Sequence, residues 1–339
     1  MSGSALRIGL VGAGLIARRS HLPAFAALPE ARVTAVASGR LVSAEAAATE
    51  FSIPRVYESW EELIADQDVD AVDICTVNSL HAPIAIAAAR AGKHVLVEKP
   101  MAVTLAQADE MIDAARRAGV LLMVAHNLRY VPVFEMLHEV VSSGRIGPIQ
   151  TARGVFMHAG PDETWGAESD WFWRQEMAGG GAVLDLGIHM IDLLRWVVAR
   201  PVLEVGAMVS RVAKPTFAED NAFITMRFDG GILGSVQTSW TARPFPDNQV
   251  TIQGDEGRVI VGRTAAEPLV IYRQSAGGVE KDTPKIAEAS RLGNLFSHFV
   301  SCVRDGNSPR VSGVDGRDSL AVALAAYESA RAGQIVAVS

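Results

Sequence analysis

The sequence predicts an α/β protein: a doubly wound domain on a parallel sheet, followed by an α+β domain with a large, mainly antiparallel open sheet. Strand-like and helix-like segments alternate up to about residue 125, and strand-like segments follow one another after about residue 145. The length of 339 residues also exceeds what one hydrophobic core usually supports. We therefore expect two domains, residues 1–125 and 126–339, with closing helices that can pack back on the first.

The first domain contains short runs of Val, Ile and Leu without polar alternation, which is typical of parallel strands buried on both faces. Ala-rich helical patterns separate these runs, so right-handed crossovers are expected. The predicted strands are ALRIGLVGAG, ARVTAVAS, VDAVDICTV, KHVLVEKP and VLLMVAHN, and the clearest helices are HAPIAIAAARAG and LAQADEMIDAARRAG.

The second domain begins a series of strands joined by short turns, which predicts antiparallel pairing. The predicted strands are IQTARGVFMH, VLEVGAMVSR, NAFITMRF, ILGSVQTSW, NQVTIQG, GRVIVGR and PLVIYR, with turns at residues 229–231 and 254–257. Helices are expected at roughly 181–198, 289–304 and 315–332. Some strands, such as ILGSVQTSW, carry apolar residues on both faces, which suggests that another subunit covers the sheet.

Composition excludes several classes of partner. The net charge of -7 and the lack of a Lys/Arg cluster argue against nucleic acid and against an anionic membrane surface. Arg18 and Arg19 follow the apolar opening stretch, whereas a signal peptide carries its basic residues before it. Only two cysteines are present, and Cys75 lies in the apolar run AVDICTV, which indicates a reduced core thiol. We expect a cytoplasmic protein.

A glycine-rich turn follows the first strand directly and opens a helix: Gly12-Ala13-Gly14-Leu15-Ile16-Ala17. The glycines let the backbone turn tightly and approach a pyrophosphate, and Ala17 allows close packing of helix on strand. The spacing alone is weak evidence, but its place at the start of a multi-unit parallel domain predicts dinucleotide binding.

The end of the second strand should distinguish the two nicotinamide dinucleotides, because an acid there would bond the ribose 2′-hydroxyl. The chain has Ser38-Gly39-Arg40 at this place and no acid before Glu45. A hydroxyl and a guanidinium can accept a 2′-phosphate, which predicts NADP in preference to NAD. The alternative is that Arg40 is an exposed residue at a helix start.

The stretch GGGAVLDLGIHMIDLLRWV places two kinds of residue on separate arcs of one helix. Asp185, His189 and Asp192 share one arc, and the packing residues share another: Leu186, Met190, Leu193, Leu194 and Val197. A carboxylate four residues before a histidine can orient the imidazole for proton transfer. A solvated face and a metal site are the alternatives; with no HExxH-like pattern or cysteine cluster, we expect no metal.

Another apolar strand ends in Glu98-Lys99-Pro100. The carboxyl edge of an open parallel sheet is where doubly wound folds bind ligands, so these charges can serve a site as well as a solvated loop. Pro100 fixes its own φ and bars the α conformation at Lys99, so it can aim the amine into the crevice.

Together these pieces resemble the Gfo/Idh/MocA family of oxidoreductases, nearly end to end. The matching segments are Gly12 to Ala17, Thr76 to His81, Ala91 to Pro100, His126 to Arg129, Gly179 to His189 and Tyr327 to Ala330. Val77 departs from the family, where many relatives carry proline, and Ser38 stands where NAD-using relatives usually have Asp.

The resemblance implies a Rossmann domain and hydride transfer between nicotinamide C4 and a carbinol or carbonyl carbon of a sugar, cyclitol or related polyol. It implies Lys99, Asp185 and His189 as catalytic residues. The expected cofactor contacts are Gly12, Gly14, Leu15, Ile16, Ser38, Arg40, Thr76, Asn78, His81, Glu98 and Lys99. It also implies a homodimer or homotetramer through the second-domain sheet.

Further residues are candidates for substrate contact, because an amphipathic ring can meet the apolar face of a sugar. They are Asn127, Arg129, Trp165, Trp171 and Asp192, and core packing is expected for at least one tryptophan of Trp165, Trp171 and Trp173. Arg129 could instead hold a helix end or pair with an acid. Two other functions stay open: a silent nucleotide-binding sensor, and a redox-neutral glycosidase or lyase that keeps its dinucleotide bound.

Overall fold

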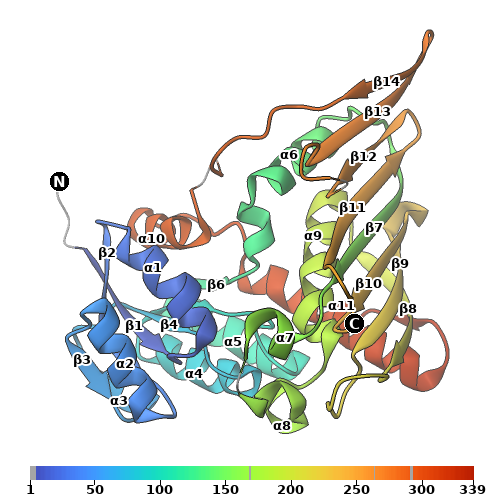
Figure 1. Cartoon of the computed structure of the whole chain (residues 1–339). Helices are drawn as coiled ribbons and strands as arrows, with labels where there is room; N and C mark the ends of the chain where they lie inside the picture. Colours follow the sequence, from blue (N-terminus) through green and yellow to red (C-terminus); the bar gives the residue numbers. More distant parts are fainter. Residues whose placement is uncertain (1–4, 168, 263, 291–292) are drawn as a thin grey trace. The chain divides into compact units, whose positions relative to one another are not determined.

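The computed structural model describes residues 5–167, 169–262, 264–290 and 293–339. The chain forms two compact units. The first contains the residues up to His126, Glu176–Ala178 and a C-terminal segment that ends at Arg317, and the second contains most of the chain from Asn127 to residue 290 and Asp318–Ser339. Each unit is described by itself (Figure 1).

The first unit is built on a six-stranded, fully parallel sheet with the order β3-β2-β1-β4-β5-β6. Its strands are β1 (Leu6–Val11), β2 (Ala31–Ala37), β3 (Arg55–Tyr57), β4 (Ala71–Ile74), β5 (His94–Val97) and β6 (Leu122–Val124). The order runs outward from β1 in both directions, so the predicted doubly wound fold is confirmed. The carboxyl ends of β1 and β4 therefore mark a topological switch point.

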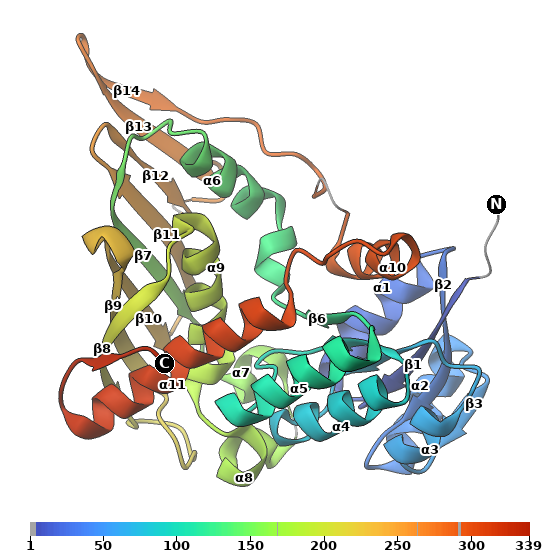
Figure 2. The ribbon, with the colours of Figure 1, turned by 180° about the vertical axis from the view of Figure 1, so that it is seen from behind.

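Helices connect these strands: η1 (Ala17–His21), α1 (Leu22–Ala26), α2 (Leu41–Phe51), α3 (Trp60–Ala65), α4 (Asn78–Arg90) and α5 (Leu105–Ala118). Helix α10 (Leu295–Asp305) belongs to the same unit but comes from a segment late in the chain. Side-chain caps fix several starts: Ser59, Thr104 and Asn294 each accept a backbone N–H three residues on. Figure 2 shows α4 and α5 side by side against the sheet.

The second unit contains a nine-stranded sheet with the order β14-β13-β12-β11-β7-β10-β9-β8-β15. The predicted mainly antiparallel sheet is confirmed, with one parallel pair between β7 and β10. The strands are β7 (Ile149–Met157), β8 (Val202–Ser210), β9 (Asn221–Phe228), β10 (Leu233–Ser239), β11 (Asp247–Gly254), β12 (Gly257–Val261), β13 (Leu269–Ser275), β14 (Gly278–Asp282) and β15 (Val336–Ala337).

Helices cover one face of this sheet, since α9 (Ile188–Val198) packs on β7 and β10 and α6 (Pro132–Ser142) packs on α9 and β12. The remaining helical segments are η2 (Asn127–Tyr130), α7 (Pro161–Trp165), η3 (Asp170–Trp173), α8 (Gln175–Ala178), η4 (Val183–Gly187), η5 (Asp229–Gly231) and α11 (Gly313–Ala332). After its first residue, strand β9 alternates between buried and exposed residues, so the opposite sheet face is open in the single chain.

Two details differ from the sequence prediction. The helix expected at 289–304 begins at Leu295, because Asn294 caps it and Gly293 has φ of +71°; residues 291–292 of that expectation lie outside the described residues. Strands β3, β14 and β15 were not predicted. They are short, and β14 is exposed along its whole length, so neither hydrophobic alternation nor an apolar run marks it.

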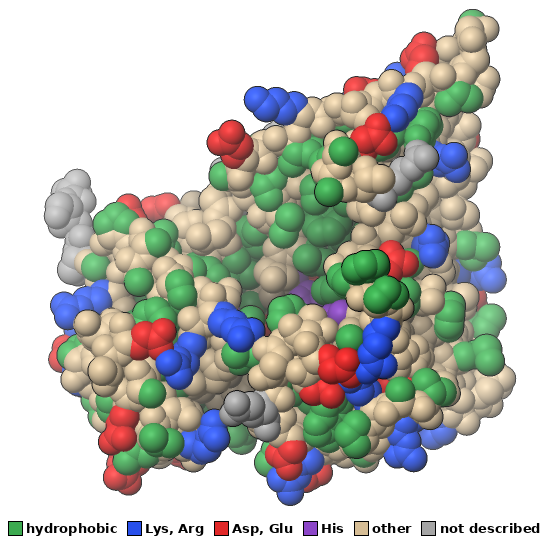
Figure 3. All heavy atoms as spheres, viewed as in Figure 1, with side chains coloured by type: hydrophobic (Ala, Val, Ile, Leu, Met, Phe, Trp, Pro, Cys, Tyr) green, Lys and Arg blue, Asp and Glu red, His purple; other side chains and the backbone are tan. Residues whose placement is uncertain are grey.

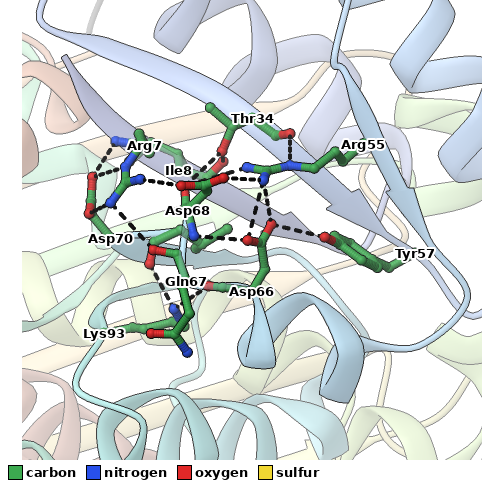
Figure 4. Close-up of polar contacts among 11 residues, drawn as sticks. Arg7, Ile8, Thr34, Arg55, Tyr57, Asp66, Gln67, Asp68, Asp70 and Lys93 are labelled. Atoms are coloured by element: carbon green, nitrogen blue, oxygen red, sulfur yellow. Dashed lines mark hydrogen bonds and ion pairs between the residues drawn. The ribbon is translucent and has the colours of Figure 1, made fainter. Parts of the chain in front are cut away.

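A polar network holds together the edge of the first sheet where its strands begin (Figure 4). Arg7 donates to the Asp70 carboxylate at 2.6 and 3.0 Å, and Arg55 pairs with Asp66 at 3.0 Å. The buried Lys93 amine donates to the backbone carbonyl oxygens of residues 66 and 69. This edge lies at the opposite end of the strands from the glycine-rich turn, and the network is interpreted as structural.

No helix in the described part of the chain is long and apolar enough to cross a membrane. On the face drawn in Figure 3, acidic and basic side chains are interspersed.

Candidate functional site

The glycine-rich turn has the geometry of a phosphate cradle. Gly12 has φ of +98°, and a Cβ added there would lie 2.5 Å from the carbonyl oxygen of Cys75, so no larger residue fits. Around Gly14 a Cβ would meet nothing within 4 Å, and the residue is exposed. Ala17 is fully buried at the start of η1. Tight backbone approach on one side and open space at a helix start on the other fit a dinucleotide pyrophosphate.

The residues expected to discriminate between NAD and NADP follow β2. Ser38 is half-buried, and Gly39 and Arg40 are exposed. Arg40 takes the N-cap position of α2 with extended backbone geometry, and its side chain makes no capping hydrogen bond. The hydroxyl and the guanidinium therefore lie at the carboxyl edge of the sheet, where the adenine ribose binds in folds of this type.

The segment after β4 is held by its own side chains. Asn78 donates to the carbonyl oxygen of Ala178 at 2.8 Å, and the His81 ring lies 2.7 Å from the carbonyl oxygen of Pro100. Burial lowers the pKa of His81, which favours the neutral ring. Thr76 remains half-exposed beside the turn. Of these three expected cofactor contacts, Asn78 and His81 thus shape the backbone, and Thr76 is accessible.

Glu98 and Lys99 come directly after β5, at the same sheet edge. Glu98 accepts a hydrogen bond from the Lys99 backbone N–H through Oε2, and its Oε1 lies 3.0 Å from Nε2 of His21. Burial opposes ionisation of Glu98, but the hydrogen bond and charge of His21 outweigh it and lower the pKa. The turn that carries Lys99 is therefore anchored through an ionised carboxylate.

In the second unit, Asp185 lies in the π-helical stretch η4 and His189 in the following α9. The predicted packing arc is confirmed, because Leu186, Met190, Leu193, Leu194 and Val197 are all buried. Asp185 and His189 are both half-exposed, and the His189 ring lies 5.6 Å from the ring of Phe156. The helix thus separates its core contacts from a titratable pair.

Two residues that sequence reasoning missed support this pair. The indole N–H of the fully buried Trp240 donates to Oδ2 of Asp185 at 2.9 Å. Glu219 accepts the backbone N–H of Val183 at 2.8 Å and the hydroxyl of Tyr327 at 2.9 Å, so it caps the start of η4. A tryptophan ending strand ILGSVQTSW was visible in the sequence, but its contact depends on the fold.

We predict that Trp240→Phe, which keeps a ring but removes the indole donor, lowers kcat about tenfold, since a hydrogen bond to a charged group contributes about 1.5 kcal/mol or more. Steady-state kinetics together with thermal unfolding would measure it. Trp60→Phe, made in α3 of the first unit, is the matched control. Unchanged kcat in a folded Trp240→Phe variant would show that Asp185 needs no such donor.

Two of the expected substrate residues contact each other. Arg129 donates to Asp192 at 2.9 and 2.7 Å, and both side chains are at most 4% exposed. Ser319 also donates to Asp192, at 3.1 Å. This arrangement matches the alternative that Arg129 pairs with an acid. Asn127, at the start of η2, is exposed.

The aromatic segment divides into an exposed and a packed part. Trp165 ends α7 and is 43% exposed, and the half-buried Trp171 stacks on Phe172 at 3.9 Å. Trp173 packs edge-on against the buried Trp240 at 5.6 Å, as the expected core contact of one tryptophan. Trp165 and Trp171 remain the candidates for contact with a substrate.

One group of described residues could geometrically hold a metal: His21, Asp73 and Cys75, whose ligand atoms lie within 4.8 Å of one another. Nδ1 of His21 is 2.9 Å from Asp73 and 3.1 Å from the Cys75 sulfur, which are hydrogen-bond distances. Burial and the Asp73 charge raise the pKa of the Cys75 thiol, so the sulfur keeps its proton. We interpret the group as hydrogen-bonded.

Comparison with known proteins adds two family matches. Residues 6–126 match the model described as "Oxidoreductase family, NAD-binding Rossmann fold", and residues 134–260 match "GFO/IDH/MocA C-terminal domain". The chain is 35% identical to 1,5-anhydro-D-fructose reductase of Ensifer adhaerens over 97% of both chains. It is 38% identical to trans-1,2-dihydrobenzene-1,2-diol dehydrogenase of Mus musculus over 89% of both.

Solved structures are similar over nearly the whole chain. A levoglucosan dehydrogenase in complex with NADH and levoglucosan has a TM-score of 0.87 and 27% identity, covering 99% of this chain and 100% of that one. Aldose-aldose oxidoreductase from Caulobacter crescentus, complexed with glycerol, has a TM-score of 0.85 and 29% identity, with 98% and 99% covered.

Proposed function

The chain belongs to the Gfo/Idh/MocA family of oxidoreductases, and from this premise we propose that it oxidises or reduces a sugar, cyclitol or related polyol. The observation that carries the proposal is the coexistence, in a chain with an NAD-binding Rossmann fold, of the Gly12 cradle with Lys99, Asp185 and His189. A bound nicotinamide dinucleotide would supply the two-electron chemistry at the carbinol carbon.

The catalytic roles follow from the chemistry of each side chain. His189 accepts the hydroxyl proton during oxidation, and Asp185, four residues earlier, orients the ring and stabilises its charged form. The indole N–H of Trp240 donates a hydrogen bond to the Asp185 carboxylate and so fixes its orientation. Lys99 donates a hydrogen bond to the reacting oxygen and stabilises its developing negative charge. These roles require no metal ion, so turnover should survive EDTA.

Relatives support the substrate class. Proteins named for 1,5-anhydro-D-fructose, myo-inositol and levoglucosan are among the similar chains. The direct test is reduction of NAD and NADP during incubation with a panel of sugars and cyclitols, and oxidation of NADH and NADPH with the matching ketones. Tight dinucleotide binding with no turnover on any of them would favour the sensor. Substrate conversion on retained dinucleotide, without net absorbance change, would favour the redox-neutral glycosidase or lyase.

We also propose a preference for NADP. The support is the hydroxyl of Ser38 and the exposed guanidinium of Arg40 at the end of β2, where a carboxylate would repel a 2′-phosphate. Several similar solved structures hold NADH or NAD, so the preference of this chain between the two dinucleotides has to be measured.

Ser38→Asp is predicted to lower kcat/KM with NADP at least about tenfold and to raise it with NAD, because the new carboxylate repels phosphate and accepts a ribose hydroxyl. Initial rates with both dinucleotides would measure the change. Ser142→Asp adds the same charge on an exposed helix end of the second unit and should leave the ratio unchanged. A wild-type preference for NAD would contradict the proposal.

A homodimer or homotetramer through the open face of the second sheet is proposed as well. Phe223 of β9 and Met208 of β8 are opposite each other on that face, 60% and 79% exposed. The face is otherwise more polar than expected, since β10 exposes Ser235 and Gln237 beside Leu233. Light scattering of the purified chain would test the proposal, and a monomer at micromolar concentration would contradict it.

A further inference from the structure

A buried chain of charged groups lies behind the Glu98-Lys99 turn, entirely within the first unit. His21 ends η1, Asp73 lies in the middle of β4, and Glu98 follows β5. Nδ1 of His21 is 2.9 Å from Oδ2 of Asp73, and Nε2 is 3.0 Å from Oε1 of Glu98. The side chains of His21 and Asp73 are 1% and 0% exposed, and that of Glu98 is 16% exposed.

The geometry points to a doubly protonated His21 ring. An ionised carboxylate only accepts hydrogen bonds, so a ring with a carboxylate oxygen at each nitrogen carries a proton on both. His21 is then an imidazolium between two negative charges. Burial opposes this charge, but the charge and the hydrogen bond of Asp73 raise the pKa of His21 well above its usual value. The ring of Phe296 packs edge-on against the His21 ring at 4.7 Å.

This arrangement uses a rare helix geometry and places a charged residue in a buried strand, and both are unfavourable in themselves. Residues 17–21 form a π-helical stretch, a rare geometry that frequently occurs at functional sites, and His21 is its last residue. Asp73 stands in a strand whose four residues are all buried. A buried ion pair is often no more stable than apolar residues of the same shape, so stability alone gives little reason for the pair.

Both oxygens of Glu98 are engaged: Oε1 by His21 and Oε2 by the backbone N–H of Lys99. Any rotation of the carboxylate would break one of these bonds, and loss of its charge would weaken both. The carboxylate thus transmits the position of His21 to the residue that bears the proposed catalytic amine.

We propose that His21, held by Asp73, is a positioning residue that keeps Glu98 ionised and oriented, so that the Lys99 turn is preset for reaction. This inference rests on the proposed function for its kinetic consequence. The protonation state of His21 can be measured without any substrate.

The first experiment is NMR of the full-length chain with 15N-labelled histidine. We expect one ring to stay doubly protonated at about pH 8, where an ordinary histidine is neutral, and its signals to be absent in His21→Gln. Asp73→Asn removes one carboxylate and should let His21 lose its second proton at lower pH. A neutral His21 ring in the wild type at this pH would overturn the proposal.

The second experiment separates positioning from general structural support. In His21→Gln and Asp73→Asn we expect kcat to fall about 10- to 100-fold, as for a misplaced catalytic group. Both the polyol KM and the dissociation constant for NADPH, followed by fluorescence, should stay within about threefold. His94→Gln, at the opposite end of β5, is the control and should keep wild-type kcat.

Two negative outcomes have different meanings. If both variants keep kcat within about twofold of wild type, the positioning role is wrong although the chain is an oxidoreductase. If the wild type turns over no polyol, the proposed function is wrong, and the NMR result still decides the state of His21.

Discussion

Replacing His189 or Lys99 with alanine is expected to lower kcat by about 10²- to 10⁴-fold, which is the usual contribution of a positioned proton-transfer group. The two residues come from different units of the chain and from different local structures, α9 and the turn after β5. Both side chains are half-exposed, so neither belongs to the fully buried core of its unit. Thermal unfolding of the variants should therefore stay close to wild type while turnover is lost.

The double variant makes the prediction sharper. If His189 and Lys99 act on the same oxygen in one step, removing both should cost little more than the worse single change. Costs that multiply would assign the residues to separate steps. His94→Gln and Lys93→Met change the same residue types elsewhere in the first unit and serve as controls. The Lys93 amine donates to two backbone carbonyl oxygens, so Lys93→Met also measures how the loss of a structural lysine changes stability. Near-full turnover of either alanine variant would contradict the catalytic assignment.

The sequence was most informative where one residue type can satisfy a local requirement. The Gly12 turn, the strands around it and the packing arc of α9 could all be predicted, because backbone sterics and hydrophobic periodicity act over a few residues. The strand β3, with three half-buried residues, is too short to show a period. Its place at the sheet edge is set by pairing with β2.

The supporting residues of the site could not be predicted in the same way. His21, Asp73 and Glu98 are separated by up to 77 positions and meet only because β4 and β5 are neighbours in the sheet and η1 packs beside them. Trp240 reaches Asp185 across 55 positions. Contacts of this kind depend on the order of the strands in the sheet, and local sequence patterns do not reveal that order.

Asp192 shows how a correct helical arc can still mislead. The arc placed it with Asp185 and His189, but its surroundings come from elsewhere in the chain: Arg129 lies 63 positions before it and Ser319 127 positions after it. Both oxygens of Asp192 are used in these contacts. The buried pair predicts a structural role, whereas the sequence suggested a substrate contact.

Asp192→Ala is therefore expected to destabilise the chain by about 3–5 kcal/mol, because it leaves the Arg129 guanidinium buried without its carboxylate. For a unit of this size the thermal midpoint should fall by about 6 to 20 °C. Glu110→Ala removes one partner of the exposed Arg90–Glu110 pair and should cost about 1 kcal/mol or less. Calorimetry of the three proteins would compare them. A thermal midpoint equal to that of the wild type, together with a raised KM for the polyol, would instead indicate that Asp192 contacts the substrate.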